Sequence, residues 1–344
     1  MEMLKKEAEA VSGRIDALSM KNPLIIPIIT DMHVRGLEDK CFEMLCASFE
    51  ALKDRVHMDA LISLGDNFAM LGREEHITNE RVSELLTGFA EKLSRAAGTP
   101  SFFINGNHDG IGTDFFSPEL WRGAVTGRFD GGLECHDGDS VYFYVDYPKR
   151  SLRCVFLSVP YGSDIDIDYP TPRWAFGRRQ IEWLDTVALD VPDGTGVIIF
   201  SHVPFNYYYA SEKDWKMATW DGHKQTESFV SALCGWIDDR EGAERVLYDF
   251  VLHRGRFIEK KDTALIACIA GHEHYDAVFA PGQSIGDLTN RLTCPQMLIG
   301  AANSRINPAF RNKARIGVSI DIMVYENGRL ELVRFGDGED HRIL

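Results

Sequence analysis

FFINGNHDG, the stretch from Phe102 to Gly110, joins an apolar run to a cluster of side chains that can bind metals and protons. Pro100 before the run and Gly106 after it predict a short buried strand that ends in a turn. In open α/β sheets, ligands bind outside the carboxyl ends of the strands, so the Asn-His-Asp triplet lies where functional residues are usually found. Gly, Asn and Asp are also ordinary turn residues, and the stretch by itself leaves both interpretations open.

Two apolar runs earlier in the chain end in the same kind of side chain. Leu24–Ile29 and Ala60–Leu64 predict buried strands, and they are followed by Thr-Asp-Met-His and Gly-Asp-Asn respectively. Asp31 and His33 lie two residues apart at a strand end, so both side chains can reach one cation. Pro27, inside the first run, is expected at a strand edge, where its missing N–H donor is tolerated.

Helical patterns separate these strands. Apolar residues at helical spacing predict helices over 38–53 and 74–97, the second of which is closed by Gly98 at its carboxyl cap. The order strand, helix, strand, helix, strand predicts parallel strands with right-handed crossovers.

The amino-terminal segment predicts an amphipathic helix over residues 3–19, with one apolar stripe formed by Leu4, Ala8, Val11, Ile15 and Leu18. We expect this helix, within residues 1–20, to dock on its own domain; a helix that binds a partner protein is the alternative. Residues 21–344 are expected to form a single domain, because no linker, repeat or low-complexity segment divides them.

Two later strands carry histidines at their carboxyl ends. Val197–Phe200 is followed by Ser201 and His202, and Ala264–Ala270 is followed by Gly-His-Glu-His. The second motif contains a further pair of imidazoles, so five predicted strands in all end in side chains that can bind a cation.

The remaining elements follow the same patterns. Antiparallel strands are expected over 141–147 and 152–159, helices over 177–188, 224–238 and 241–253, and strands over 296–301, 317–325 and 330–334. Asn327 and Gly328 between the last two strands indicate a hairpin. The aromatic-rich segment 206–223 predicts a lid or stacking surface for a substrate, or alternatively a small aromatic core.

Composition excludes several classes of protein. The chain has 344 residues, of which 44% are hydrophobic and 26% charged, as in globular domains and unlike disordered or fibrous chains. A formal net charge of −15 argues against nonspecific binding to nucleic acid or to an anionic membrane. A small phosphorylated substrate is still allowed, because bound cations would invert the local field.

The sequence also bears on the compartment. No apolar run approaches the roughly 18 residues that a membrane span needs. The seven cysteines are odd in number and form no C-x-x-C pair, which favours a reducing compartment over a disulfide framework. Charged residues are spread over the first ten positions, unlike a signal peptide. We therefore expect a cytoplasmic protein.

The five strand ends carry, in order, Asp31-x-His33, Gly65-Asp66, Gly106-Asn107-His108-Asp109, Ser201-His202 and Gly271-His272-x-His274. This order, in matching strand contexts, resembles the calcineurin-like metallophosphoesterase superfamily over about residues 24–275. The resemblance implies a four-layer α/β/β/α sandwich, in which two mixed β-sheets pack face to face and helices flank them.

The resemblance also assigns roles to these side chains. It implies that one metal is held by Asp31, His33, Asp66 and His274, and the other by Asp66, Asn107, His202 and His272, with Asp66 as the bridge. His108 matches the family position near the leaving group, where an imidazole donates a proton or stabilises the phosphoryl charge. Asp109 is expected to orient its neighbours rather than to bind a metal.

The implied chemistry has a physical basis. Two divalent cations roughly 3.5 to 4 Å apart lower the pKa of a bridging water, which gives a hydroxide at neutral pH, and clamp the oxygens of an in-line displacement at phosphorus. Mixed His, Asp and Asn ligands suit Mn, Fe, Zn, Co or Ni, whereas a magnesium site would consist of oxygen ligands alone.

Two subfamilies fit poorly. Protein Ser/Thr phosphatases continue the Gly-Asp motif with an Asp and then an Arg, at positions held here by Ala69 and Met70. Purple acid phosphatases have a tyrosine ligand where Ala69 stands. The acid that pairs with the proton-donating histidine in the protein Ser/Thr phosphatase pattern is therefore missing, and we expect Asp109 or a backbone carbonyl to orient His108 instead.

We expect a hydrolase of phosphomonoester or phosphodiester bonds in a small-molecule or nucleotide-like substrate. A nuclease acting on DNA or RNA is one alternative, and the acidic balance and the lack of a basic stripe count against it. A noncatalytic metal-binding scaffold is another, and the complete set of ligands counts against it.

Overall fold

The computed structural model describes residues 1–69, 78–106, 108–109, 118–158, 178–204, 264–285, 288–289, 294–310 and 312–342. Several expectations lie outside these ranges, namely the ligand role of Asn107, the aromatic segment 206–223, and the helices over 224–238 and 241–253.

The first β-sheet has the strand order β15-β14-β13-β1-β2-β3. Its strands are β1 (Leu24–Ile29), β2 (Leu61–Ser63), β3 (Ser101–Phe103), β13 (Ser319–Glu326), β14 (Arg329–Gly336) and β15 (His341–Arg342). β1, β2 and β3 run parallel, as the sequence predicts, whereas β13 is antiparallel to both of its neighbours. Asn327 and Gly328, with φ of 51° and 85°, form the predicted hairpin turn between β13 and β14.

Pro27 does not lie at a sheet edge, which corrects the expectation from sequence. β1 is an interior strand between β13 and β2, and Pro27 lies opposite Ile322 of β13. The pairing of β1 with β2 begins only at Ile28, which lies opposite Ile62. Pro27 is tolerated because it precedes this parallel pairing, so its missing N–H removes no bond from the ladder between β1 and β2.

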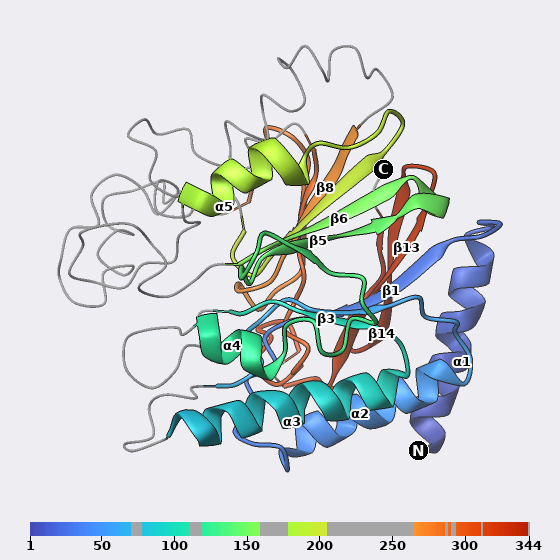
Figure 1. Ribbon diagram of the computed structural model, residues 1–344. Coiled ribbons are helices and arrows are strands. Elements are labelled where there is room, and N and C mark those ends of the chain that lie inside the picture. The colour runs from blue at the N-terminus through green and yellow to red at the C-terminus, as the bar shows by residue number, and fades with distance from the viewer. Residues whose placement is uncertain are drawn as a thin grey trace.

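Four helices cover the outer face of the first sheet (Figure 1): α1 (Glu2–Ala17), α2 (Lys40–Lys53), α3 (Asn79–Ala97) and α4 (Pro118–Ala124). α2 begins after Asp39, whose side chain accepts a hydrogen bond from the Cys41 N–H at 2.8 Å. α3 ends at Gly98, whose φ of 69° is the left-handed conformation of a helix cap. The apolar stripe of α1 is buried in this layer, so the helix packs on the rest of the chain.

The second β-sheet has the order β4-β5-β6-β7-β8-β12-β9. Its strands are β4 (Cys135–His136), β5 (Phe143–Tyr147), β6 (Leu152–Leu157), β7 (Gly196–Ser201), β8 (Ala264–Ala270), β9 (Ala277–Phe279) and β12 (Gln296–Leu298). A 3₁₀ turn, η1 (Pro148–Arg150), joins β5 to β6, and a separate two-stranded ribbon contains β10 (Ser284–Ile285) and β11 (Leu288–Thr289). Helix α5 (Arg178–Trp183) and the π-helical turn η2 (Leu184–Ala188) pack on the outer face of this sheet.

The two sheets pack face to face around a shared apolar core. Residues of β1, β2 and β3, such as Ile26, Ile62 and Phe102, contact residues of β6 and β7, such as Phe156 and Phe200. With helices outside each sheet, the molecule is the predicted four-layer α/β/β/α sandwich of two mixed sheets. Among the described residues, no helix has the length and apolar character to cross a bilayer.

Candidate metal centre

The predicted site residues that the structure describes lie on loops at the carboxyl ends of five strands. Asp31 and His33 follow β1, and Asp66 follows β2. These two loops continue the pairing of the strands, because the Asp31 N–H donates to the Gly65 carbonyl and the His33 N–H donates to the Asp66 carbonyl, each at 3.0 Å. His202 follows β7, and its carbonyl accepts from the N–H of Gly271 after β8 at 2.9 Å. The loops of each sheet therefore hold one another in place.

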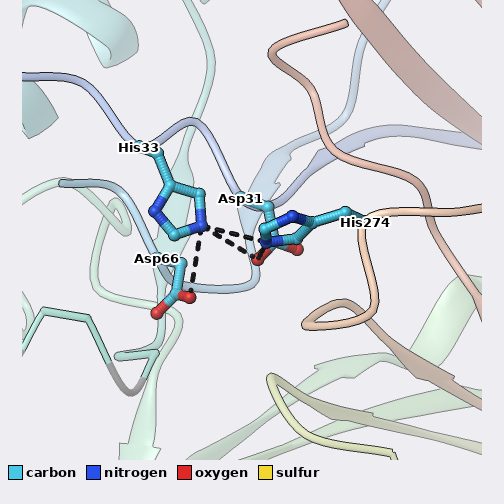
Figure 2. A group of neighbouring side chains, drawn as sticks. All are labelled: Asp31, His33, Asp66 and His274. Carbon is cyan, nitrogen blue, oxygen red and sulfur yellow. Dashed lines mark hydrogen bonds and ion pairs between the residues drawn. The ribbon is translucent and has the colours of Figure 1, made fainter. Parts of the chain in front are cut away.

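One group of potential ligands contains Asp31, His33, Asp66 and His274, whose ligand atoms all lie within 4.8 Å of one another (Figure 2). Asp31 Oδ1 lies 3.2 Å from His274 Nε2, and His33 Nε2 lies 3.5 Å from Asp66 Oδ2. The Nε2 atoms of His33 and His274 are 3.1 Å apart. The side chains converge from both sheets on one point.

A second group contains Asp66, His202 and His272, also within 4.8 Å. His202 Nε2 lies 3.3 Å from Asp66 Oδ2. Asp66 is therefore common to both groups. Asn107, which the resemblance places in this group, lies outside the described residues.

The donor atoms fit a cation. Asp31 is fully buried, and its Oδ2 accepts hydrogen bonds from the Thr30 hydroxyl and the His272 N–H, both at 2.8 Å. Its other oxygen, Oδ1, is buried, has no hydrogen-bond partner among the described residues and faces the Nε2 atoms of His33 and His274. A buried carboxylate oxygen left in this state is costly, and a bound cation would satisfy it.

The backbone at the candidate ligands is strained. Asp31, His33, Asp66, His272 and His274 have φ of 52°, 47°, 49°, 71° and 61°, in the left-handed region that residues other than glycine rarely adopt. Each such residue costs on the order of 1 to 3 kcal/mol and persists only where the surroundings impose it. Strain collected on one set of converging side chains is typical of a functional site.

The family follows from the sequence as a whole. The model of the calcineurin-like phosphoesterases matches residues 26–276, which include every loop described above. The chain belongs to the calcineurin-like phosphoesterase family. No curated protein matches the sequence.

Among solved structures, that of PhoD agrees with this fold. PhoD is similar with a TM-score of 0.51 at 11% identity, over 91% of this chain and 65% of the PhoD chain. GAP50, the anchor in the inner membrane complex of Plasmodium, is similar with a TM-score of 0.45 at 11% identity, over 94% of this chain and 89% of its own. The phosphoesterase chain thus spans about 65% of the length of PhoD, and identities this low bear on the fold alone.

Charge pairing dominates the electrostatics of this candidate metal centre. Burial by itself raises the pKa of Asp66, but the charge and hydrogen bond of His202 lower it to about 2. Burial lowers the pKa of His202, and the Asp66 carboxylate more than reverses this and raises it to about 9. Burial and the neighbouring His202 lower the pKa of His272 to about 3. In the absence of cations, a proton on His202 therefore balances part of the carboxylate charge.

The tautomer of His202 is fixed by the end of β2. Its Nδ1 lies 2.8 Å from the Leu64 carbonyl oxygen, which only accepts hydrogen bonds, so Nδ1 carries a hydrogen and donates it. Nε2 is thereby directed at Asp66 and the second ligand group. A metal-binding histidine commonly has its other ring nitrogen held in this way.

His108 lies beside the ligands and belongs to neither group. Its ring is 4.7 Å from the ring of His33, and its backbone N–H donates to Asp66 Oδ1 at 2.7 Å. Its Nδ1 lies 2.9 Å from the Ala69 carbonyl oxygen. The sequence left Asp109 or a backbone carbonyl to orient this imidazole, and in the structure the carbonyl of Ala69 does so. The sequence could not identify which carbonyl, because every residue has one.

Asp109 ties the loop after β2 to the loop after β3. Its Oδ1 accepts from the N–H groups of Asn67 and Phe68 at 2.9 and 3.2 Å, and its Oδ2 accepts from Asn67 Nδ2 and the Gly106 N–H at 3.0 and 2.9 Å. Burial and the charge of Asp66 raise its pKa to about 7 although these donors favour the carboxylate. Among the described residues, Asp109 belongs to neither ligand group, and its hydrogen bonds hold together the two loops that surround them.

Three glycines of the site motifs allow the loops to approach. A Cβ on Gly65 would lie 2.7 Å from the Asn105 carbonyl carbon, a Cβ on Gly106 would lie 2.8 Å from Asp66 Cγ, and a Cβ on Gly271 would lie 2.8 Å from Asp31 Oδ2. Such distances leave no room for a side chain. A sequence signal was present, because a glycine stands directly before Asp66, Asn107 and His272.

Proposed function

We propose that this phosphoesterase binds two divalent cations and hydrolyses phosphomonoester or phosphodiester bonds. The position of Asp66 carries the proposal, since one buried carboxylate belongs to both groups of potential ligands. A shared carboxylate brings two cations together while it offsets their repulsion. Mixed imidazole and carboxylate ligands suit Mn, Fe, Zn, Co or Ni, and Asn107 is proposed to complete the second group.

His108 and Asp109 have separate roles in the proposed reaction. Bound cations would lower the pKa of a water molecule and offset the charge of the phosphoryl group. His108, held through Nδ1 by the Ala69 carbonyl, presents Nε2 as the nitrogen that exchanges a proton with the leaving group or stabilises its charge. Asp109 holds the two loops that bear Asp66 and His108.

We propose a small-molecule or nucleotide-like substrate. The formal net charge of −15 repels extended polyanions at long range, whereas a small phosphorylated compound meets chiefly the local field of the bound cations. The same charge argues against nucleic acid and anionic membrane as partners.

The test is hydrolysis of p-nitrophenyl phosphate and bis-p-nitrophenyl phosphate by protein loaded with Mn²⁺. We expect His108→Ala to lower kcat by about 10²- to 10⁴-fold, the range for a general acid, while divalent cations still bind. His57→Ala is the control, because this imidazole is 86% exposed and precedes β2, at the opposite end of that strand from the Asp66 loop. Failure of the metal-loaded protein to cleave any of a broad panel of phosphoesters would exclude the proposed activity.

A further inference from the structure

A buried ionic cluster lies between the two sheets at the end of their shared core. On the inner face of β13 and β14, the pairs Tyr325–Leu330 and Met323–Leu332 are apolar, and the next pair in register is Asp321 and Arg334. Arg334 and Asp321 are each only 1% exposed, and Arg334 Nη2 lies 2.9 Å from Asp321 Oδ1. An ion pair therefore replaces apolar packing where the core approaches the metal centre.

The same guanidinium reaches across to the second sheet. Arg334 Nη2 lies 2.5 Å from Oδ1 of Asp276, a residue in the loop between β8 and β9. The Gly300 N–H donates to the same oxygen at 2.8 Å. A Cβ on Gly300 would lie 2.9 Å from both oxygens of Asp276, so the backbone encloses this carboxylate closely. Asp276 is thus held by a cation from one sheet and by an amide from the other.

Asp276 lies two residues after His274 and four after His272. It therefore closes the short loop that carries both histidines, whose left-handed backbone needs support from its surroundings. A second contact joins the sheets at this end, where the Ala302 N–H donates to the carbonyl of Thr30, next to Asp31, at 2.8 Å.

The spacing of the sheets decides whether the candidate ligands converge. Asp31, His33 and Asp66 come from the first sheet, whereas His202, His272 and His274 come from the second, and each ligand group draws on both. A shift of the 271–276 loop relative to β1 therefore changes the distances within both groups.

We propose that Arg334 is a positioning residue. By holding Asp276, it fixes the 271–276 loop, and with it His272 and His274, against the first sheet. Arginine suits this role because its planar fork donates to Asp276 and to the Ser319 hydroxyl while it forms an ion pair with Asp321. The inference rests on the metal centre of the proposed function, and it holds whichever phosphoester is cleaved.

The test measures metal binding by the full-length protein in Asp276→Asn and Arg334→Met. Free Mn²⁺ followed by electron paramagnetic resonance gives the affinity, and the visible absorption of bound Co²⁺ reports coordination geometry. We expect both variants to bind Mn²⁺ about 10- to 100-fold more weakly, the usual effect of removing a group that supports metal ligands, with a changed Co²⁺ spectrum. Asp276→Asn is nearly isosteric and decides the outcome if Arg334→Met does not fold.

Arg153→Met is the matched control. Arg153 is also a buried arginine, paired with Asp146 at 2.7 and 2.8 Å, but it bonds the carbonyls at the end of the η2 turn rather than a ligand loop. We expect it to lower the melting temperature and to leave the affinity and the Co²⁺ spectrum unchanged. Wild-type affinity in Asp276→Asn, or an equal loss of affinity in Arg153→Met, overturns the proposal. A wild-type protein that binds Mn²⁺ but cleaves no phosphoester disproves the proposed activity and leaves this test decisive.

Discussion

Gly106 lies where the loop after β3 crosses the loop after β2. Its N–H donates to Asp109, and a Cβ at this position would lie 2.8 Å from the Cγ of Asp66. The shared carboxylate can therefore keep its place only if residue 106 has no side chain. The requirement is steric and follows from the close approach of two backbones.

At the residue scale, we expect Gly106→Ala to displace Asp66, to destabilise the protein by about 1 to 3 kcal/mol and to weaken metal binding. Gly123→Ala in α4 is the control, because a Cβ there meets nothing within 4 Å, and replacing a helical glycine by alanine stabilises by about 0.5 to 1 kcal/mol. Urea unfolding and Mn²⁺ titration measure the two effects. Wild-type metal affinity in Gly106→Ala would contradict the steric explanation.

At the scale of elements, α1 shows how a helix at the chain start is held. Leu4, Ala8, Val11 and Ile15 recur at steps of four and three and are buried in the helical layer of the first sheet. Arg315 of the segment before β13 pairs with Glu7 of α1 at 2.7 Å, but this guanidinium is largely exposed and the pair adds little. Apolar burial is therefore the main force that docks α1.

We expect Val11→Asp to lower the free energy of unfolding by about 3 kcal/mol, because it places a carboxylate without a partner in an apolar contact. Ala10→Asp is the control, since residue 10 lies one position away on the exposed face of the same helix. Chemical denaturation followed by circular dichroism compares the two variants. Equal stability of Val11→Asp and the wild type would show that the helix does not depend on this face.

At the scale of the whole molecule, charge at the candidate metal centre couples to folding. The folded-state pKa of His202 is about 9, above the ordinary value of 6.5, so the stability from its proton is complete below pH 6.5 and is lost as the pH rises to 9. The pKa of His33 is raised as well and acts in the same direction. The pKa of Asp66 is about 2, so this group stays ionised throughout that interval.

We therefore expect the metal-free protein to lose stability between pH 6.5 and 9, by about 3 kcal/mol from His202 if its proton is fully lost. Saturating Mn²⁺ should reduce or abolish this loss, because the cation replaces the proton beside Asp66 and stabilises the folded state further as the pH rises. Melting temperatures at pH 6.5, 7.5 and 8.5, with chelator and with Mn²⁺, measure both slopes. A metal-free melting temperature that rises over this interval would refute the coupling.

Much of the fold and of the site could be predicted from the sequence. β1 and β8 have the predicted bounds, because a buried strand requires a continuous apolar run and a loop begins where that run stops. Asp31, His33, Asp66, His202, His272 and His274 stand directly after such runs, and parallel strands bring their carboxyl ends to one edge. The order of these motifs along the chain was enough to indicate the family and the four-layer sandwich.

Other features depend on contacts between residues far apart in the chain, which have no local pattern. Pro27 lies in an interior strand because β13, almost 300 residues later, pairs with β1. The Ala69 carbonyl that orients His108 belongs to the backbone, so the residue type at position 69 does not indicate this contact. In the sequence, nothing distinguishes Arg334 from another arginine on a strand, because its contact with Asp276 forms only when the two sheets pack together. By itself the sequence determined which side chains end each strand, and only the tertiary structure decided which of them meet and what holds them there, since such contacts depend on how the two sheets pack.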